Sequence, residues 1–203
     1  MPKKFRLFRR QKENIWKKLS EEIGAEYIPA ERWKRNEKVV ARHENWTITI
    51  ESYYNDDELG DLATKITAPY VNRDDFYFRI YRADFFQNLS VKLGMQDIII
   101  GHKQFDKEFI IQGNDERKLQ ELFDNDLIRQ IISWQPQIQL FSKVDSNWVV
   151  DDWREGISEL VFITPSVIKD KDRLRDLYEL FAELLNHLCH IGSAYEDDPR
   201  YKE

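Results

Sequence analysis

The sequence predicts an α+β fold: a mainly antiparallel sheet of about seven or eight strands, with a long C-terminal helix packed on one face and shorter helices at the edges. Three observations support this prediction. Apolar and polar residues alternate in several short runs, which is typical of half-buried strands. Turn-forming residues separate these runs, which predicts hairpins. The segment 171–190 repeats its leucines at helical spacing.

The N-terminal third is expected to begin with a helix over 11–23, which a following glycine is placed to end. Its buried face is predicted from the spacing of the large apolar residues Ile15, Trp16, Leu19 and Ile23. A hairpin is expected over 38–54 with its turn at Glu44-Asn45, because apolar and polar residues alternate in the second arm. After an acidic loop, residues 62–70 are predicted to form a third strand.

The most patterned stretch of the chain, "GMQDIIIGHKQFDKEFIIQGND", covers residues 94–115. We interpret it as turns and caps rather than as a ligand loop or a catalytic loop. A short helix over 84–94 is expected to end at its first glycine. Two short strands, 97–100 and 107–112, are then predicted to flank a turn at 101–106, because glycine and aspartate suit turns.

The C-terminal half is predicted to alternate short helices with strands before the long helix. Asn114 or Asp115 is placed to cap a helix over 116–123, and a second short helix is expected over 125–135. Strands are expected at 138–144, 147–153 and 157–165. Asp170 is placed to cap the final helix. Its apolar residues fall within an arc of about 120° at 100° per residue: Leu174, Leu177, Tyr178, Phe181, Leu184, Leu185 and Leu188.

The chain is expected to be one domain with two short appendages. A length of 203 residues is enough for one well-packed core, and seven glycines and six prolines leave little room for long linkers. The predicted organisation is a basic N-terminal arm at 1–10, a single α+β domain at 11–192 and a polar tail at 193–203.

Charge is distributed unevenly along the chain. Residues 1–18 carry eight Lys or Arg and one Glu, a net charge of +7, so the rest of the chain carries −6 − 7 = −13. An acidic body argues against nucleic acid as a partner, because phosphate binding requires a basic surface. The arm is interpreted as a solvated terminus, with contact to an anionic membrane surface as the alternative.

Cysteine and hydropathy indicate a cytoplasmic protein. The lone cysteine, Cys189, excludes an intramolecular disulfide and a CxxC site. No apolar run is long enough for a transmembrane helix, and no signal-peptide core follows the basic N-terminus.

A family resemblance is carried by three short groups of residues. Gly94-Met95-Gln96-Asp97, then Phe105-Asp106, then Gly113-Asn114-Asp115 form a pattern that resembles a family of uncharacterised bacterial proteins. The likeness covers roughly residues 16–141. It implies a bacterial protein and transfers no catalytic or binding residue.

Reactive residues form no recognisable catalytic motif. The sequence has no GxSxG elbow, P-loop, GxGxxG turn or HExxH helix. His187, Cys189 and His190 are close in sequence, but on a helix they point in different directions and cannot converge on one metal ion. His102 and Asp106 have no nucleophile beside them, and the acidic loop lacks calcium-loop spacing. We predict no catalytic residues, no metal and no cofactor.

The binding residues with the strongest signal lie on a fourth predicted strand over 76–83. Tyr77, Arg79 and Tyr81 share one face of it, which offers stacking surfaces and a planar donor for anions. Tyr53 is a candidate for the same face. The structural alternative is a second layer packed on the sheet, with the arginine at its rim.

Three functions remain open from the sequence. The favoured hypothesis is a non-catalytic module that binds a small molecule or a protein, near an anionic membrane surface if the arm binds there. The second is an enzyme whose site is assembled from distant residues. The third is a homo-oligomer whose tyrosine-rich face is the interface.

Overall fold

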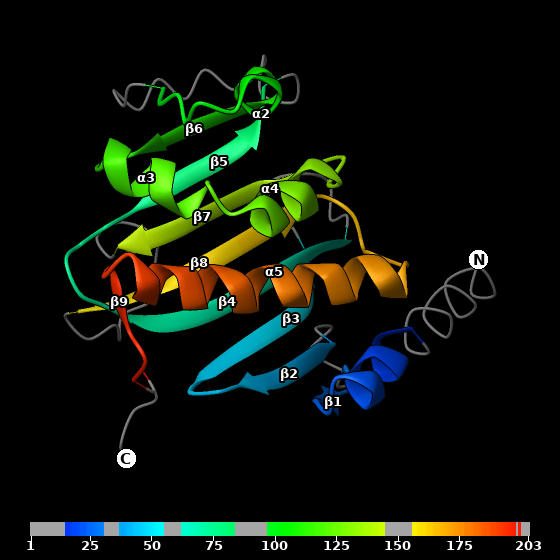
Figure 1. Cartoon of the computed structure of the whole chain (residues 1–203). Coiled ribbons are helices and arrows are strands. Elements are labelled where there is room, and N and C mark those ends of the chain that lie inside the picture. Colours follow the sequence, from blue (N-terminus) through cyan, green and yellow to red (C-terminus); the bar gives the residue numbers. More distant parts are fainter. Residues whose placement is uncertain are drawn as a thin grey trace.

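The fold is α+β, as predicted. We describe it from a computed structural model that covers residues 15–30, 37–54, 62–83, 97–144, 156–197 and 199. In this part of the chain, nine strands form one antiparallel sheet, and the long helix α5 (Lys171–His190) crosses the middle of one face (Figure 1). Residues 15–22 form a helix, as predicted for that part of 11–23.

The sheet has the order β1-β2-β3-β4-β8-β7-β5-β6, with β9 paired to β4. Its strands are β1 (Glu26–Ile28), β2 (Lys38–His43), β3 (Trp46–Tyr54), β4 (Leu62–Asn72), β5 (Phe78–Arg82), β6 (Phe109–Gly113), β7 (Gln139–Val144), β8 (Ile157–Thr164) and β9 (Ala194–Tyr195). The strand β8 lies between β4 and β7, so the two halves of the sheet are joined by a strand from the C-terminal third.

The predicted β2–β3 hairpin is confirmed. It turns at Glu44, whose φ of 52° lies in the left-handed region, and pairs His43 with Trp46. Trp46, Ile48 and Ile50 face the core with almost no exposure. The third predicted strand is also confirmed and extends to Asn72. The three-residue β1 was not predicted, because it is too short to show alternation.

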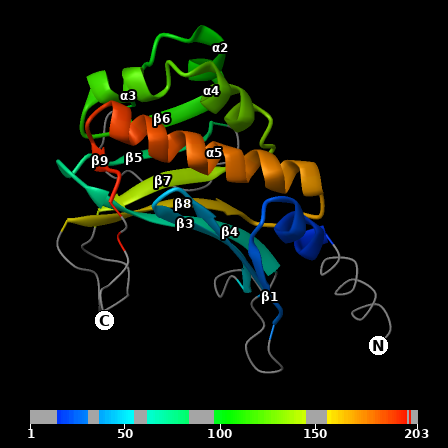
Figure 2. The same cartoon turned by 60° about the horizontal axis from the view of Figure 1, so that its bottom comes forward.

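Three helices cover one face of the sheet: α3 (Glu116–Leu122), α4 (Asp126–Ser133) and α5 (Figures 1 and 2). Each begins at a side chain that accepts backbone N–H bonds. Asp115 accepts from Lys118 N, Asn125 from Leu127 and Ile128 N, and Asp170 from Asp172 and Arg173 N. Of the two predicted caps for α3, Asp115 is therefore the one that acts.

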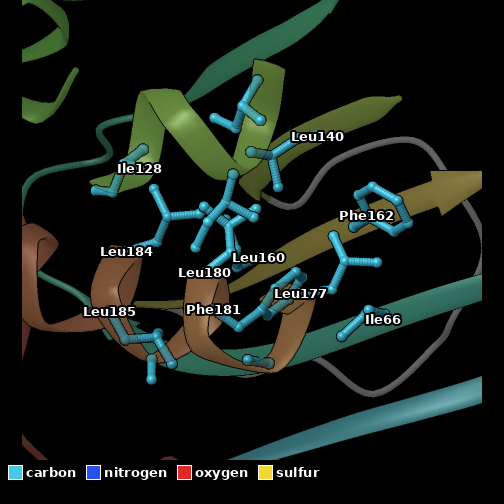
Figure 3. Close-up of a cluster of buried hydrophobic side chains, with 14 of the residues drawn as sticks. Ile66, Ile128, Leu140, Leu160, Phe162, Leu177, Leu180, Phe181, Leu184 and Leu185 are labelled. Atoms are coloured by element: carbon cyan, nitrogen blue, oxygen red, sulfur yellow. The ribbon is translucent and has the colours of Figure 1, made fainter. Parts of the chain in front are cut away.

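The hydrophobic core lies between α5 and the sheet. All the predicted apolar residues of α5 are buried except Tyr178, which is half-buried and packs against the core. Figure 3 shows Leu184 pointing toward Ile128 of α4, and Phe181 above the strands that carry Leu160 and Ile66. The predicted burial of this helix face is confirmed.

The predicted turn at 101–106 is wrong, because residues 103–108 form the short helix α2 (Lys103–Glu108). The Asp106 carboxylate accepts N–H bonds from Ile100 and Gly101 at 3.0 and 3.1 Å, which holds the loop before the helix. Phe105 is buried, with its ring centroid 4.6 Å from that of Phe109. Residues four apart on a helix lie on the same side, which brings these two aromatic rings together. The packing of the rings thus favours a helix where the glycine and the aspartate predicted a turn.

The strand predicted at 97–100 is also not formed. This segment makes one ladder-like bond, from Ile98 N to Ile111 O at 2.8 Å, and otherwise has no regular structure. The strand predicted to start at 107 begins instead at Phe109, where α2 ends.

The predicted boundary between domain and tail at 192 differs from the structure. Ser193 and Ala194 are buried, and β9 pairs Ala194 with Asn72 and Tyr195 with Val71. The folded unit therefore continues at least to Tyr195. The predicted elements at 84–94 and 147–153, the acidic loop and the arm lie outside the described residues.

Asn114 joins α3 to the β4–β5 connection. Its Oδ1 accepts from Tyr77 N at 3.0 Å, and its Nδ2 donates to Asp75 O at 2.9 Å. Asp75 has a φ of 56°, so the amide holds an unfavourable backbone conformation in place. The side chain thus acts as a brace between two segments far apart in sequence.

Asn114→Ala is expected to lower the free energy of unfolding by about 1–2 kcal/mol, because two hydrogen bonds to the β4–β5 connection are lost. Urea denaturation measures this loss. His102→Ala is the control from the same stretch, since the imidazole only meets the exposed Asp124 carboxylate at 3.3 Å. Equal losses in the two variants would contradict the bracing role of Asn114.

Candidate functional site

On β5 the candidate binding residues lie on the outer face of the sheet, opposite the buried Phe78 and Ile80. Figure 2 shows α5 over the other face. Along β5, Phe78 and Ile80 point into the core, whereas Arg79 and Tyr81 point outward and are half-buried. This confirms the predicted division of the strand into two faces. The pairing of neighbouring strands then decides which other side chains surround them.

Arg79 and Tyr81 are surrounded by residues from three other segments. Arg79 lies opposite Phe141 on β7 and opposite Gln112 on β6. Its Cζ is 5.8 Å from the centroid of the Phe141 ring, within the range of a cation–π contact. Gln112 Nε2 donates to Asp97 Oδ1 at 3.0 Å. We call Arg79, Tyr81, Asp97, Gln112 and Phe141 the Arg79 cluster.

The electrostatics of the cluster favour a hydrogen-bond donor at Tyr81. Burial raises the pKa of the Tyr81 hydroxyl above its usual value, the nearby Asp97 carboxylate raises it further, and Arg79 offsets part of the rise. The hydroxyl therefore stays protonated well beyond neutral pH. Asp97 sits at the exposed edge of the cluster.

Arg79 has no ion-pair partner among the described residues. The neighbouring Arg82 provides a contrast on the same strand. It donates to the Gln135 carbonyl at 2.7 Å and to the Glu108 carboxylate at 3.3 Å, so its guanidinium serves the fold. Within the described ranges, no carboxylate holds the Arg79 guanidinium in this way.

Tyr53 is on the same face but not in the cluster. Its strand β3 is separated from β5 by β4, β8 and β7. Four strand steps of about 4.8 Å place it roughly 19 Å away. Burial, followed by the Glu51 carboxylate, raises the pKa of Tyr53. The structure thus does not join Tyr53 to Arg79 in one aromatic surface.

Tyr77 immediately precedes β5 and is half-buried. Its backbone N–H and carbonyl are both held by Asn114, at 3.0 and 3.3 Å. Tyr77 therefore lies just before the outward-facing residues Arg79 and Tyr81 of β5. The sequence identified these three residues through strand alternation alone.

The middle of the outer face offers little accessible surface. Ala63, Thr67 and Val161 lie there and are 1%, 8% and 2% exposed. Toward β2, Glu51 pairs with Lys38 and Lys65 at 3.0 and 3.9 Å. The binding chemistry is thus concentrated at the β6–β5–β7 end.

Two polar clusters elsewhere lack the geometry of a catalytic site. Tyr70 lies near the Ser142 and Ser158 hydroxyls, and burial raises its pKa to about 12. It is fully buried, so a substrate cannot reach it. Lys118 contacts the Asp74 carboxylate and donates to Ser193 Oγ at 2.9 Å. An ammonium that donates to the hydroxyl cannot take its proton. The contact instead ties the segment after α5 to α3.

The C-terminal histidines do not form a metal site with a third ligand. The His187 and His190 rings are 5.3 Å apart, whereas Cys189 lies near Glu44 and Glu196. Burial, followed by these two carboxylates, raises the pKa of the Cys189 thiol to about 11. In the described ranges no group of three or more His, Cys, Asp or Glu residues could hold a metal, and no helix could span a membrane.

Asp97, Gln112 and Phe141 were missed by reasoning from the sequence. Phe141 alternates correctly within 138–144, but nothing local shows that β7 is the neighbour of β5. Asp97 belongs to the patterned stretch and was assigned to a strand. Their sequence context shows only that each is a polar or aromatic residue in or beside a predicted strand, and this does not identify a binding site.

No protein-family model, curated protein or solved structure matches this chain. The resemblance to a family of uncharacterised bacterial proteins therefore stays a prediction. Its residues have local roles in the fold: Asp106 holds the loop before α2, Asn114 braces the β4–β5 connection and Asp115 caps α3.

Proposed function

We propose that the protein is a non-catalytic binding module whose ligand carries a planar anionic or aromatic group and lies on the Arg79 cluster. The observation that supports this proposal is the Arg79 guanidinium, which lies beside the Phe141 ring and has no ion-pair partner in the described part of the chain. A guanidinium without a carboxylate partner can form two parallel hydrogen bonds to a planar anion. We place the module in the cytoplasm, in keeping with its lone cysteine.

The neighbouring groups complete the recognition chemistry. Phe141 supplies an aromatic surface beside the Arg79 guanidinium. Asp97 accepts from Gln112, which fixes the amide beside Arg79. The Arg79 guanidinium thus supplies the donors, while the Asp97 carboxylate lies at the exposed edge of the cluster.

Planar aromatic anions are expected to raise the melting temperature of the wild-type chain. Benzoate and phenyl phosphate are suitable probes for thermal denaturation. A ligand at 100 times its Kd stabilises a protein by about 2.7 kcal/mol. Arg79→Ala is expected to abolish the shift. Arg42→Ala is the matched control, because Arg42 is an exposed arginine at the far end of the same face, and it should keep the full shift.

Two results would contradict this proposal. Equal shifts in Arg79→Ala and Arg42→Ala would mean that the probes bind elsewhere, and no shift with any probe would remove the proposed ligand class. The homo-oligomer alternative uses the same face. It predicts a concentration-dependent mass in analytical ultracentrifugation, which Arg79→Ala would lower.

A further inference from the structure

A second surface, on the helical side of the molecule, combines exposed apolar and acidic groups. Leu127 on α4 is 43% exposed and Trp134 at its C-terminus is 59% exposed. Trp134 comes seven positions after Leu127, so the two share one side of the helix. Beside them, α5 presents Asp176, Glu179 and Glu183. We call these five residues the α4–α5 seam.

The two helices of the seam run antiparallel. Asn125 Nδ2 at the start of α4 donates to Glu183 Oε1 at 2.7 Å, and Arg173 Nε near the start of α5 donates to Gln135 Oε1 at 2.8 Å. Leu127 therefore lies near Glu183, and Trp134 lies near the N-terminal end of α5. Figure 1 shows α4 beside α5 along this seam.

The acidic residues of α5 form a continuous stripe. Asp172, Asp176, Glu179 and Glu183 are spaced by four, three and four residues, which places them on one side of the helix. Arg175 pairs with the first three at 3.3, 3.9 and 3.9 Å. It also binds Glu22 at 3.2 Å, and so it approaches the stripe from the side opposite α4. On the α4 side, Arg173 donates to Gln135, and Glu183 has no ion-pair partner among the described residues.

We propose that residues 1–14 of the same chain dock along the α4–α5 seam. The segment "MPKKFRLFRRQKEN" has six Lys or Arg and one Glu, a net charge of +5, with two phenylalanines and a leucine interleaved. Its composition is thus complementary to the seam in charge and in apolar character. Exposed tryptophans beside acidic groups are suited to such a segment, through apolar burial and cation–π contacts.

The arm and the seam begin at the same end of α5, on opposite sides of that helix. The next residues are anchored at the N-terminal end of α5: Trp16 Nε1 donates to Ile168 O at 3.2 Å, and Glu22 contacts Lys171 and Arg175. Trp134 lies at the same end, because its neighbour Gln135 binds Arg173. Fourteen extended residues span up to about 46–50 Å, whereas the 20-residue α5 is about 30 Å long. The arm can therefore reach the whole seam.

Covalent attachment favours the arm over a separate molecule as the occupant of the α4–α5 seam. A segment joined to its site by a short linker has an effective concentration in the millimolar range. Because the attraction is largely between exposed charges, it weakens as salt shortens the Debye length. The docked arm would cover Trp134 at low salt and uncover it at high salt.

Paramagnetic relaxation in the full-length chain tests this docking. A nitroxide is attached to Lys4→Cys in a Cys189→Ala background, and the indole N–H of Trp134 and the amides of Leu127 and Glu183 are observed by NMR. Docking predicts strong broadening of these three signals at low salt, recovery at high salt, and unbroadened signals for Thr49 and Lys65 on the opposite sheet face.

Charge reversal supplies the matched control. Glu179→Lys with Glu183→Lys is expected to abolish the broadening, whereas Glu116→Lys with Glu121→Lys, the same charge change at exposed positions on α3, should leave it intact. Broadening that persists in the first variant, or that misses Trp134 and Leu127, would overturn the proposal.

The same labelled chain distinguishes docking within one chain from two alternatives, in which the arm binds a second copy or a membrane. Mixing it with an unlabelled, isotope-enriched chain shows whether the arm reaches a second copy, and broadening of Trp134 in that mixture would overturn docking within one chain. Co-sedimentation with phosphatidylserine vesicles, together with an unaffected Trp134 in their absence, would place the arm on a membrane and also overturn it.

Discussion

Leu184→Ala is expected to lower the free energy of unfolding by about 2–5 kcal/mol, the usual range for a buried leucine replaced by alanine. Leu184 is fully buried on α5 and points toward Ile128 of α4 (Figure 3). Its removal leaves a cavity between the two helices that the sheet below cannot fill. Urea denaturation followed by circular dichroism measures the loss.

Leu127→Ala is the matched control for this prediction. It is the same substitution on the neighbouring helix, but the side chain is 43% exposed, so the expected loss is below about 1 kcal/mol. Comparable losses in the two variants would mean that α5 does not pack on α4 and the sheet as described.

Gly113→Ala is expected to lower the free energy of unfolding by about 1–3 kcal/mol, because the added methyl group overpacks a closed site. A Cβ at this position would lie 2.6 Å from the Tyr77 carbonyl oxygen and 2.8 Å from Leu119 Cδ1. The first neighbour is backbone of the strand connection and cannot move freely. The substitution would therefore push the end of β6 away from the backbone before β5 and from α3, and denaturant titration measures the effect.

Gly101→Ala separates crowding from backbone strain. Gly101 has a φ of +91°, but no atom lies within 4 Å of a Cβ placed there. Its substitution costs only the strain, ~1 kcal/mol. A loss for Gly113→Ala no greater than that for Gly101→Ala would show that the close approach of Gly113 to Tyr77 and Leu119 is not maintained in solution.

The parts of the fold predicted from sequence are those that local patterns determine. Alternation defines the β2–β3 hairpin and assigns Phe78 and Arg79 to opposite faces of β5. Helical periodicity defines the buried face of α5, and Asp170 marks its first turn. These features depend on neighbours within a few residues.

The errors come from contacts between distant segments. Phe105 packs on Phe109 and Phe123, which turns a glycine-and-aspartate loop into α2. The strand β9 exists because a two-residue segment after α5 meets β4. Neither contact leaves a periodic signal in the sequence.

The candidate site was predictable only in part, for the same reason. Alternation places Arg79 and Tyr81 on one face, but Phe141 and Gln112 join them because β7 and β6 flank β5. That order requires β8 between β4 and β7, and it also moves Tyr53 away from the cluster. Strand order in a sheet cannot be obtained from the periodicity of single strands.

Native mass spectrometry of the purified protein tests the central claim, that the Arg79 cluster binds a ligand without transforming it. The wild-type chain and Arg42→Ala are expected to carry a bound small molecule with a planar anionic or aromatic group, recovered chemically unchanged after incubation. Arg79→Ala is expected to lack it while keeping the melting temperature of the unliganded chain. A bound molecule present equally in Arg79→Ala and Arg42→Ala, or one converted to another mass during incubation, would contradict the account.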